Sequence, residues 1–203
     1  MIYFLSDTHF FHKNICRGVS KWNETRDEGH QKTRDFDTVD QMNEQIYKAI
    51  NDKVKYNDTI YHLGDWSFDG VDKIEKSRER INCNNIHLIF GNHDQHITPV
   101  DSEYRKLFTS SDYYKEINIT NGKNPENMIC MFHYATRIWN KRHKGSIFLY
   151  GHSHNTLPNA GDKSMDVGVD TNKDYSPYSL DEILSIMKNK SNNPIDHHNL
   201  KTN

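Results

Sequence analysis

Cysteine is scarce in this chain of 203 residues, which contains only Cys16, Cys83 and Cys130. The three share no CxxC spacing, and an odd number of cysteines cannot pair completely. We therefore expect no disulfide framework, and a reducing cytosol as the location of the protein. Cys83 and Cys130 lie in or beside apolar runs, where we expect them to be small core residues.

Long apolar runs are missing too. No stretch approaches the ~18 residues that a membrane-spanning helix needs, so we expect no contact with a membrane through such a segment. Residues 1–5 are apolar, but no basic region precedes them and the chain soon turns polar. This pattern favours a first β-strand over a signal peptide.

An excess of basic charge is also absent. The chain has 26 Lys and Arg against 28 Asp and Glu, which gives a net charge of -2, and it has no long basic run. Proteins that bind nucleic acid without sequence preference are usually basic. The charge balance therefore argues against a nucleic-acid partner. It says nothing about the oligomeric state.

The chain length fits one α/β domain with a sizeable core. The apolar fraction of 34% is low, and so is the mean hydropathy of -0.94. Aromatic residues are nevertheless plentiful and the apolar residues are clustered, which argues against disorder. We expect a single domain over residues 1–190 and a flexible polar tail over residues 191–203.

Short apolar runs of about five residues, rich in β-branched and aromatic types, predict buried strands. A sixth, more alternating segment from Ser164 to Val169 predicts another strand. The five apolar runs are Ile2–Leu5, Thr59–Leu63, Ile86–Phe90, Met128–Phe132 and Ser146–Tyr150.

Helical spacing appears between these runs. Apolar residues recur from Val39 to Ile50 behind a capping-box pair, Thr38 and Gln41. A shorter helix is expected from Val71 to Ile81, and a last one follows the capping-box pair Ser179 and Glu182. Residues 10–36 show no period and predict a long loop over the site, and residues 118–127 predict a hairpin turn.

The most informative feature is a set of polar clusters, each of which directly follows an apolar run. Their placement at strand ends would bring carboxylates, an amide and imidazoles together. The clusters are Asp7-Thr8-His9, Gly64-Asp65, Gly91-Asn92-His93-Asp94, His133 and Gly151-His152-Ser153-His154.

Taken singly, each cluster has an ordinary structural interpretation. Gly64-Asp65 fits a turn after a strand, and a lone histidine such as His133 is more often structural than a ligand. As a set, they supply nitrogen and oxygen donors without a thiolate, which suits Mn, Fe, Zn, Ni or Co. Magnesium prefers more oxygen ligands. Two ions ~3.5–4 Å apart could hold a phosphoryl group and lower the pKa of a bridging water.

In this order, the clusters resemble the calcineurin-like metallophosphoesterase superfamily. Its pattern is Asp-x-His, Gly-Asp, Gly-Asn-His-Asp/Glu, a lone His, and Gly-His-x-His, and all five blocks appear across residues 7–154. Residues 164–181 also look like the closing segment of small bacterial and phage-type members. The resemblance implies an α/β fold of two facing β-sheets flanked by helices, in αββα layers.

The resemblance also implies roles. Asp65 would bridge two divalent ions, with manganese the first expectation and Ni, Fe, Zn or Co as alternatives. His93 would be catalytic, facing the substrate and assisting the leaving group, while a metal-bridging hydroxide would attack phosphorus. The first ion would be held by Asp7, His9 and His154, and the second by Asn92, His133 and His152.

One position departs from the family pattern. Many members have a second Asp three residues after the bridging one, which pairs with the His of Gly-Asn-His. Phe68 occupies that position here, and Asp69 follows it. Either Asp69 takes over through a shifted turn, or His93 lacks an orienting carboxylate.

Substrate contacts are less clearly marked. Arg17, Arg137 and Arg142 are candidates for phosphate contacts, as are Lys13 and Arg34, although a solvated basic face is an alternative. Trp66, Tyr134 and Trp139 could stack on a base or belong to the core.

Small members of the family resemble phosphodiesterases that act on nucleotide-like compounds. We therefore expect a small nucleotide-type phosphodiester as the substrate. A protein or small-molecule phosphomonoesterase is the alternative enzyme, and the lack of basic charge disfavours a nuclease. A degenerate member that serves as a binding scaffold would be expected to have lost ligands, whereas all seven positions hold competent residue types.

Overall fold

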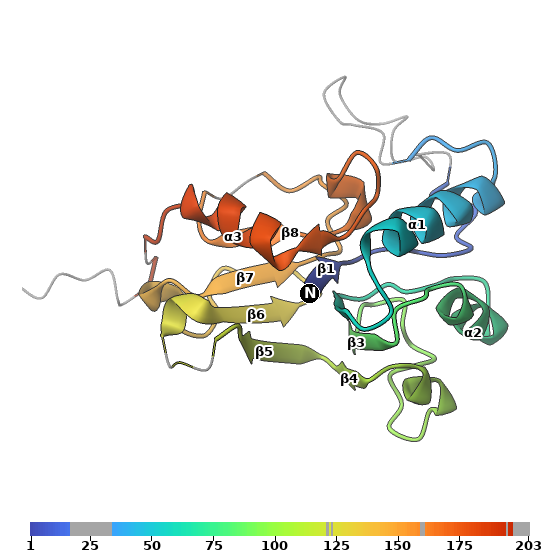
Figure 1. Ribbon diagram of the computed structural model, residues 1–203, viewed down its shortest axis with the longest axis horizontal. Coiled ribbons are helices and arrows are strands. Elements are labelled where there is room, and N and C mark those ends of the chain that lie inside the picture. The colour runs from blue at the N-terminus through green and yellow to red at the C-terminus, as the bar shows by residue number, and fades with distance from the viewer. Residues whose placement is uncertain (17–33, 121, 123, 159–160, 194, 197–203) are drawn as a thin grey trace, which may run out of the picture.

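The computed structural model describes residues 1–16, 34–120, 122, 124–158, 161–193 and 195–196. It contains two mixed β-sheets flanked by helices, which confirms the predicted α/β fold of two facing sheets. Helices α1 (Val39–Lys53) and α2 (Val71–Glu79) lie together on one side of the molecule in Figure 1, and strands β5–β8 lie on the other. Helix α3 (Leu180–Lys188) lies beside β8.

The first sheet has the strand order β4-β3-β2-β1-β9. Strands β1 to β4 run parallel, and the short β9 pairs antiparallel with β1. Because the parallel strands end at the same edge of the sheet, the loops that follow them meet there. The strands are β1 (Ile2–Leu5), β2 (Thr59–His62), β3 (Asn85–Ile89), β4 (Ser110–Asp112) and β9 (Tyr178–Ser179).

The second sheet has the order β5-β6-β7-β8. Strands β5 and β6 form an antiparallel hairpin whose turn region, residues 118–127, the sequence predicted, and β6, β7 and β8 are parallel. The strands are β5 (Tyr114–Asn118), β6 (Met128–Phe132), β7 (Ile147–Tyr150) and β8 (Ser164–Asp166). Short 3-10 helices span Glu103–Leu107, Pro125–Asn127, Arg142–Lys144 and Val169–Thr171.

Alternation along the strands divides the core into separate clusters. Tyr3 and Leu5 of β1 pack with α1 and α2 on the outer face of the first sheet. Phe4 points the other way and packs with Ile129 and Leu149 of the second sheet, so this cluster joins the two sheets. Apolar residues of α3 extend the same cluster. The described core therefore fixes the two sheets face to face.

The capping boxes determine where two of the helices begin. Thr38 and Gln41 exchange the reciprocal hydrogen bonds ahead of α1, and Ser179 and Glu182 do so ahead of α3, as the sequence predicted. The three cysteines are free and buried, which confirms Cys83 and Cys130 as core residues. Among the described residues, no helix is long and apolar enough to cross a membrane.

Candidate metal centre

The loops that follow β1, β2, β6 and β7 are connected to one another through their backbones. The amide of Asp7 donates to the carbonyl of Gly64 at 2.9 Å, and the amide of Gly151 donates to the carbonyl of His133 at 2.9 Å. The amide of His152 donates to the Asp7 carboxylate at 2.9 Å, which links the two sheets. Their polar clusters therefore converge on one place.

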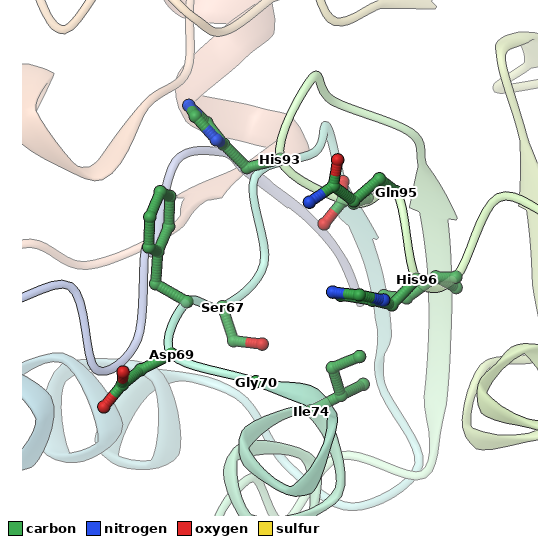
Figure 2. Close-up of a pocket in the computed structure, with 10 residues that line it drawn as sticks. Ser67, Asp69, Gly70, Ile74, His93, Gln95 and His96 are labelled. Carbon is green, nitrogen blue, oxygen red and sulfur yellow. The ribbon is translucent and has the colours of Figure 1, made fainter.

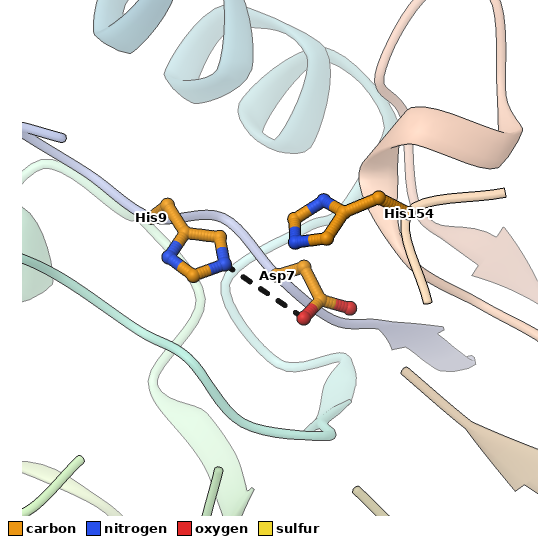
Figure 3. Close-up of side chains that lie close together, drawn as sticks. All are labelled: Asp7, His9 and His154. Atoms are coloured by element: carbon orange, nitrogen blue, oxygen red, sulfur yellow. Dashed lines mark ion pairs between the residues drawn. The ribbon is translucent and has the colours of Figure 1, made fainter. Parts of the chain in front are cut away.

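Two groups of side chains at this place have the spacing of metal sites. Within each group, one potential ligand atom from every residue lies within 4.8 Å of the others. Figure 3 shows the first group, in which the His9 ring and the His154 ring lie around the Asp7 carboxylate. The groups are Asp7, His9 and His154, and Asp65, His133 and His152.

Asp65 belongs to the second group and also lies close to His9 of the first. Its Oδ2 atom is 3.4 Å from Nε2 of His9 and 3.5 Å from Nε2 of His133. Its Oδ1 atom accepts the amide hydrogen of His93 at 2.8 Å, which fixes the orientation of the carboxylate. The amide oxygen of Asn92 lies 3.0 Å from the same Nε2 atom of His133.

Hydrogen bonds on the far side of two imidazoles fix how these rings face the centre. Nδ1 of His133 lies 2.7 Å from the carbonyl oxygen of Leu63, which can only accept, so Nδ1 carries hydrogen and Nε2 faces inward. Nδ1 of His154 lies 2.7 Å from Oδ2 of Asp170. Contacts of this kind orient histidine ligands and raise their basicity.

Arg34 holds Asp170 in place. Its Nε lies 3.0 Å from Oδ1 of Asp170, and both side chains are fully buried. It also donates to the backbone oxygens of Asp7 and Thr8. Burial raises the pKa of Asp170, but Arg34 and His154 outweigh it and hold that pKa at about 2. Arg34 is therefore a structural residue and is not exposed for the phosphate contact that the sequence suggested.

The electrostatics of the centre suit a bound cation. Burial raises the pKa of Asp7 to about 7 and lowers the pKa of His9 well below its ordinary value. Both ring nitrogens of His9 are buried and find no hydrogen-bond partner among the described residues. Burial lowers the pKa of His133, but the hydrogen bond to Asp65 and the charges of Asp7 and Asp65 raise it to about 9. A divalent ion fits this donor set, because it would pair with the carboxylates and satisfy His9.

The backbone at the centre is strained. Five of the seven predicted ligands have left-handed φ values between 45° and 65°, a region that residues other than glycine rarely adopt. Such conformations cost about 1–3 kcal/mol each and are found mainly at functional sites. The five are Asp7, His9, Asp65, His152 and His154.

Two glycines of the motifs permit the close approach of the loops. A Cβ atom at Gly91 would lie 2.2 Å from Oδ1 of Asp65, and one at Gly151 would lie 2.0 Å from Oγ of Ser6 and 2.6 Å from Oδ2 of Asp7. Neither position can accommodate a side chain. The Asp65 carboxylate occupies the space beside Gly91, and Ser6 and the Asp7 carboxylate occupy the space beside Gly151.

Asp94 has a role that the sequence did not assign. Its buried carboxylate accepts the amide hydrogens of Asp65 and Trp66 at 2.9 Å and of Gly91 at 2.7 Å. It therefore joins the loop after β2 to the loop after β3. The motif Gly-Asn-His-Asp offered a signal for Asp94. Asp170 lies in the segment of residues 164–181 that resembles the closing segment of small family members, but nothing in the sequence indicated its contact with a histidine ligand.

Residues 1–167 match the family model described as the calcineurin-like phosphoesterase superfamily domain. The chain belongs to the calcineurin-like phosphoesterase superfamily. It is thus a metal-dependent phosphoesterase by family, and members of this superfamily typically use two metal ions.

Two relatives extend the comparison across nearly the whole chain. The uncharacterized protein MJ1445 of Methanocaldococcus jannaschii is 29% identical over 191 residues, which cover 92% of this chain and 91% of that protein. The crystal structure of the protein of unknown function AQ665 from Aquifex aeolicus is similar, with a TM-score of 0.60 and 25% identity. That similarity covers 92% of this chain and 98% of the other.

The structure shows which residue contacts the ring of His93, where many members of this superfamily have a second Asp. The ring of Phe68 lies 4.7 Å from the ring of His93, between centroids. Asp69 instead pairs with Lys13 at 3.5 Å, and its side chain is half exposed. Within the described ranges, no side chain hydrogen-bonds to the His93 ring, which lies 5.5 Å from the ring of His9. An aromatic ring therefore packs against the His93 ring where many members of the superfamily have a carboxylate.

The arginine candidates for substrate contacts differ in their positions. Arg17 lies outside the described residues. Arg137 is exposed, four residues beyond His133. Arg142 is buried and pairs with Asp162 at 3.2 Å. It begins the 3-10 helix Arg142–Lys144, which lies before β7 and thus at the opposite end of that strand from the metal groups, so its guanidinium serves the fold and does not face the centre.

The aromatic candidates also differ. Trp66 is fully buried, and Trp139 is buried against Phe148, so both belong to the core. Tyr134 is 39% exposed, and its ring lies 4.7 Å from the ring of His152. Tyr134 is therefore the one of these three aromatic residues that a ligand at the centre can reach.

Proposed function

We propose that this protein is a two-metal phosphodiesterase that hydrolyses a small nucleotide-type phosphodiester. The observation that carries the proposal is the position of Asp65 Oδ2, at 3.4 Å and 3.5 Å from the inward nitrogens of His9 and His133. One carboxylate between two groups of nitrogen and oxygen donors is the arrangement that a pair of ions can share.

The proposed ligands follow the two groups. The first ion takes Asp7, His9 and His154, the second takes Asn92, His133 and His152, and Asp65 serves both. The donors suit a transition metal, and we propose manganese first, with Ni, Fe, Zn or Co as alternatives. When bound, the ions supply Lewis acidity and an activated water.

The protein side chains orient the substrate and handle the proton. The exposed ring of His93 lies beside His9 and has no hydrogen-bond partner in the described part of the chain, so it can donate to a phosphoryl or leaving-group oxygen. Arg137 and Tyr134 lie beyond His133 and are proposed to contact the second ester group. Arg17 stays a prediction.

A diester is favoured over a monoester by the environment of His93. The contact of Phe68 with His93 replaces the carboxylate that is found in the protein-phosphatase branch.

The reducing cytosol remains our proposed location, and the three free, buried cysteines support it.

A screen of metals against substrates tests the proposal. Metal-free protein is supplied with Mn, Ni, Zn and Mg in turn and assayed on a phosphomonoester and on phosphodiesters, including 2′,3′- and 3′,5′-cyclic nucleotides. We expect metal-dependent hydrolysis that is faster for a diester, with Mn among the best metals. A faster monoester reaction would replace the diesterase with the phosphomonoesterase, and no hydrolysis with any metal would refute both.

A further inference from the structure

A pocket of about 170 Å³ lies next to the metal centre, on the outer side of His93. Two segments form it. The turn after β2 contributes residues 67–70, with Ile74 of α2, and the loop after β3 contributes residues 93–97. His93 therefore belongs both to the pocket and to the surroundings of His9, which lies 5.5 Å away between ring centroids. A group attached to a phosphate at the centre can reach this pocket.

Three polar side chains of the pocket have no hydrogen-bond partner in the described part of the chain. Figure 2 shows the hydroxyl of Ser67 and the side chains of Gln95 and His96 directed toward one space, with Ile74 beside it. Over the residues that the structure describes, none of these three side chains hydrogen-bonds to another group. Because each can donate and accept, together they offer a ligand several hydrogen bonds of both kinds.

The charge of the pocket argues against a second phosphate as its occupant. Its lining contains neither Lys nor Arg. Its carboxylates are already engaged, since Asp94 accepts three backbone amides and Asp69 pairs with Lys13 and points away from the space in Figure 2. A ligand group in this pocket is therefore expected to be uncharged.

The remaining walls favour a flat ring. Ile74 and Ile97 are buried apolar side chains, and the ring of Phe68 also lines the space. The volume is below the ~300 Å³ of sites for drug-sized ligands, so it has room for one compact ring system. A glutamine amide presents a donor and an acceptor side by side, the pattern that pairs with the edge of a base.

We propose that this pocket is the subsite for the nucleobase of the substrate, with Ser67, Gln95 and His96 hydrogen-bonding to the base edge. The proposal rests on the proposed function, because it assigns the substrate class of the same centre. It places the nucleoside on the His93 side of the phosphate and leaves Tyr134 and Arg137 for the other ester group.

Isothermal titration calorimetry on the Mn-loaded protein tests the subsite without catalysis. The ligands are the 3′- and 5′-monophosphates of the four common nucleosides, and ribose 5-phosphate, which keeps the sugar and the phosphate but lacks the base. We expect at least one nucleotide to bind about tenfold or more tighter than ribose 5-phosphate, the effect of a bidentate pair with a base.

Variants show whether the pocket causes that difference. Gln95→Leu and His96→Leu should reduce the advantage of the nucleotide to about threefold or less and leave ribose 5-phosphate unchanged. Gln95→Glu removes the donor and should change which base binds best. Gln45→Leu makes the same replacement on α1, outside the pocket, and should behave as wild type. Circular dichroism and the thermal midpoint confirm that each variant is folded.

Several results would overturn the subsite. One is a wild-type protein that binds ribose 5-phosphate as tightly as every nucleotide. Another is tighter binding of the nucleotide than of ribose 5-phosphate that persists in both Gln95→Leu and His96→Leu. A third is an equal loss of affinity for the nucleotide and for ribose 5-phosphate in these variants. Each of these outcomes is compatible with metal-dependent diester hydrolysis, so it differs from a failure of the proposed function, which is the absence of turnover in the metal screen.

Discussion

The replacement Asp170→Asn should weaken both the fold and the metal centre, although Asp170 is not itself a proposed ligand. Asp170 accepts from Nδ1 of His154 at 2.7 Å and from two nitrogens of Arg34 at 3.0 Å and 3.1 Å. The side chains of Asp170 and Arg34 are fully buried. Asparagine keeps the size of the side chain and removes its charge.

Two separate costs follow from this geometry. Arg34 would stay buried without its counterion, and breaking a buried ion pair in this way costs about 3–5 kcal/mol of unfolding free energy. His154 would lose the carboxylate that orients it, and loss of such a partner typically lowers metal affinity about 10–100-fold. The first cost belongs to the metal-free protein, and the second appears only on metal binding.

A second variant separates the two costs. In Arg34→Met with Asp170→Asn, no buried charge is left unpaired, so part of the lost stability should return while the metal affinity stays low. Urea unfolding of the metal-free proteins measures the first quantity, and calorimetric titration with Mn measures the second. Wild-type metal affinity in a folded Asp170→Asn protein would refute the orienting role, and wild-type stability would refute the argument from buried charge.

Three further predictions concern the same centre. His93→Ala should slow diesters with poor leaving groups by about 10²–10⁴-fold and affect activated phenol esters less. An equal loss in kcat on both kinds of ester would remove the leaving-group role. Metal affinity, titrated on metal-free protein, should rise between about pH 6 and pH 9. The reason is that Asp7, whose pKa burial raises to about 7, and His133, with a pKa of about 9, are protonated at lower pH and must release protons to bind. A flat profile would contradict this. Gly91→Ala should cost about 1–3 kcal/mol in urea unfolding, because its Cβ would meet Asp65. Gly122→Ala, whose Cβ meets no atom closer than 3.5 Å, should cost little, and equal costs for the two would count against the close approach.

Local signals predicted much of the fold. The capping-box pairs Thr38 with Gln41 and Ser179 with Glu182 predicted the starts of α1 and α3, because each box satisfies backbone amides that a helix start leaves free. The apolar runs predicted the buried strands because these strands are covered on both faces. By contrast, β4 and β5 were not predicted. Most of their side chains are polar and none is fully buried, so no apolar run marks them.

The sequence likewise predicted the proposed ligands of the candidate site but not the residues that support them. Each proposed ligand directly follows a strand or lies within four residues of its end, which made the clusters visible in the sequence. The pairing of Arg34 with Asp170 spans 136 positions, and only the packed fold brings the two together. The residues around the His93 ring could not be predicted either, since the sequence left open whether Asp69 would orient that ring or no carboxylate would.

The central claim is that Asp65 serves two metal ions in phosphoester hydrolysis. Metal content and turnover of Asp65→Asn, with saturating Mn, test it most directly. Asp52→Asn is the matched control, because Asp52 is an exposed carboxylate that pairs with Lys48 and belongs neither to the metal groups nor to the pocket. We predict two ions per chain in the wild type and in the control, and a folded Asp65→Asn protein with fewer bound ions and almost no turnover. Near-wild-type turnover of Asp65→Asn would contradict the account.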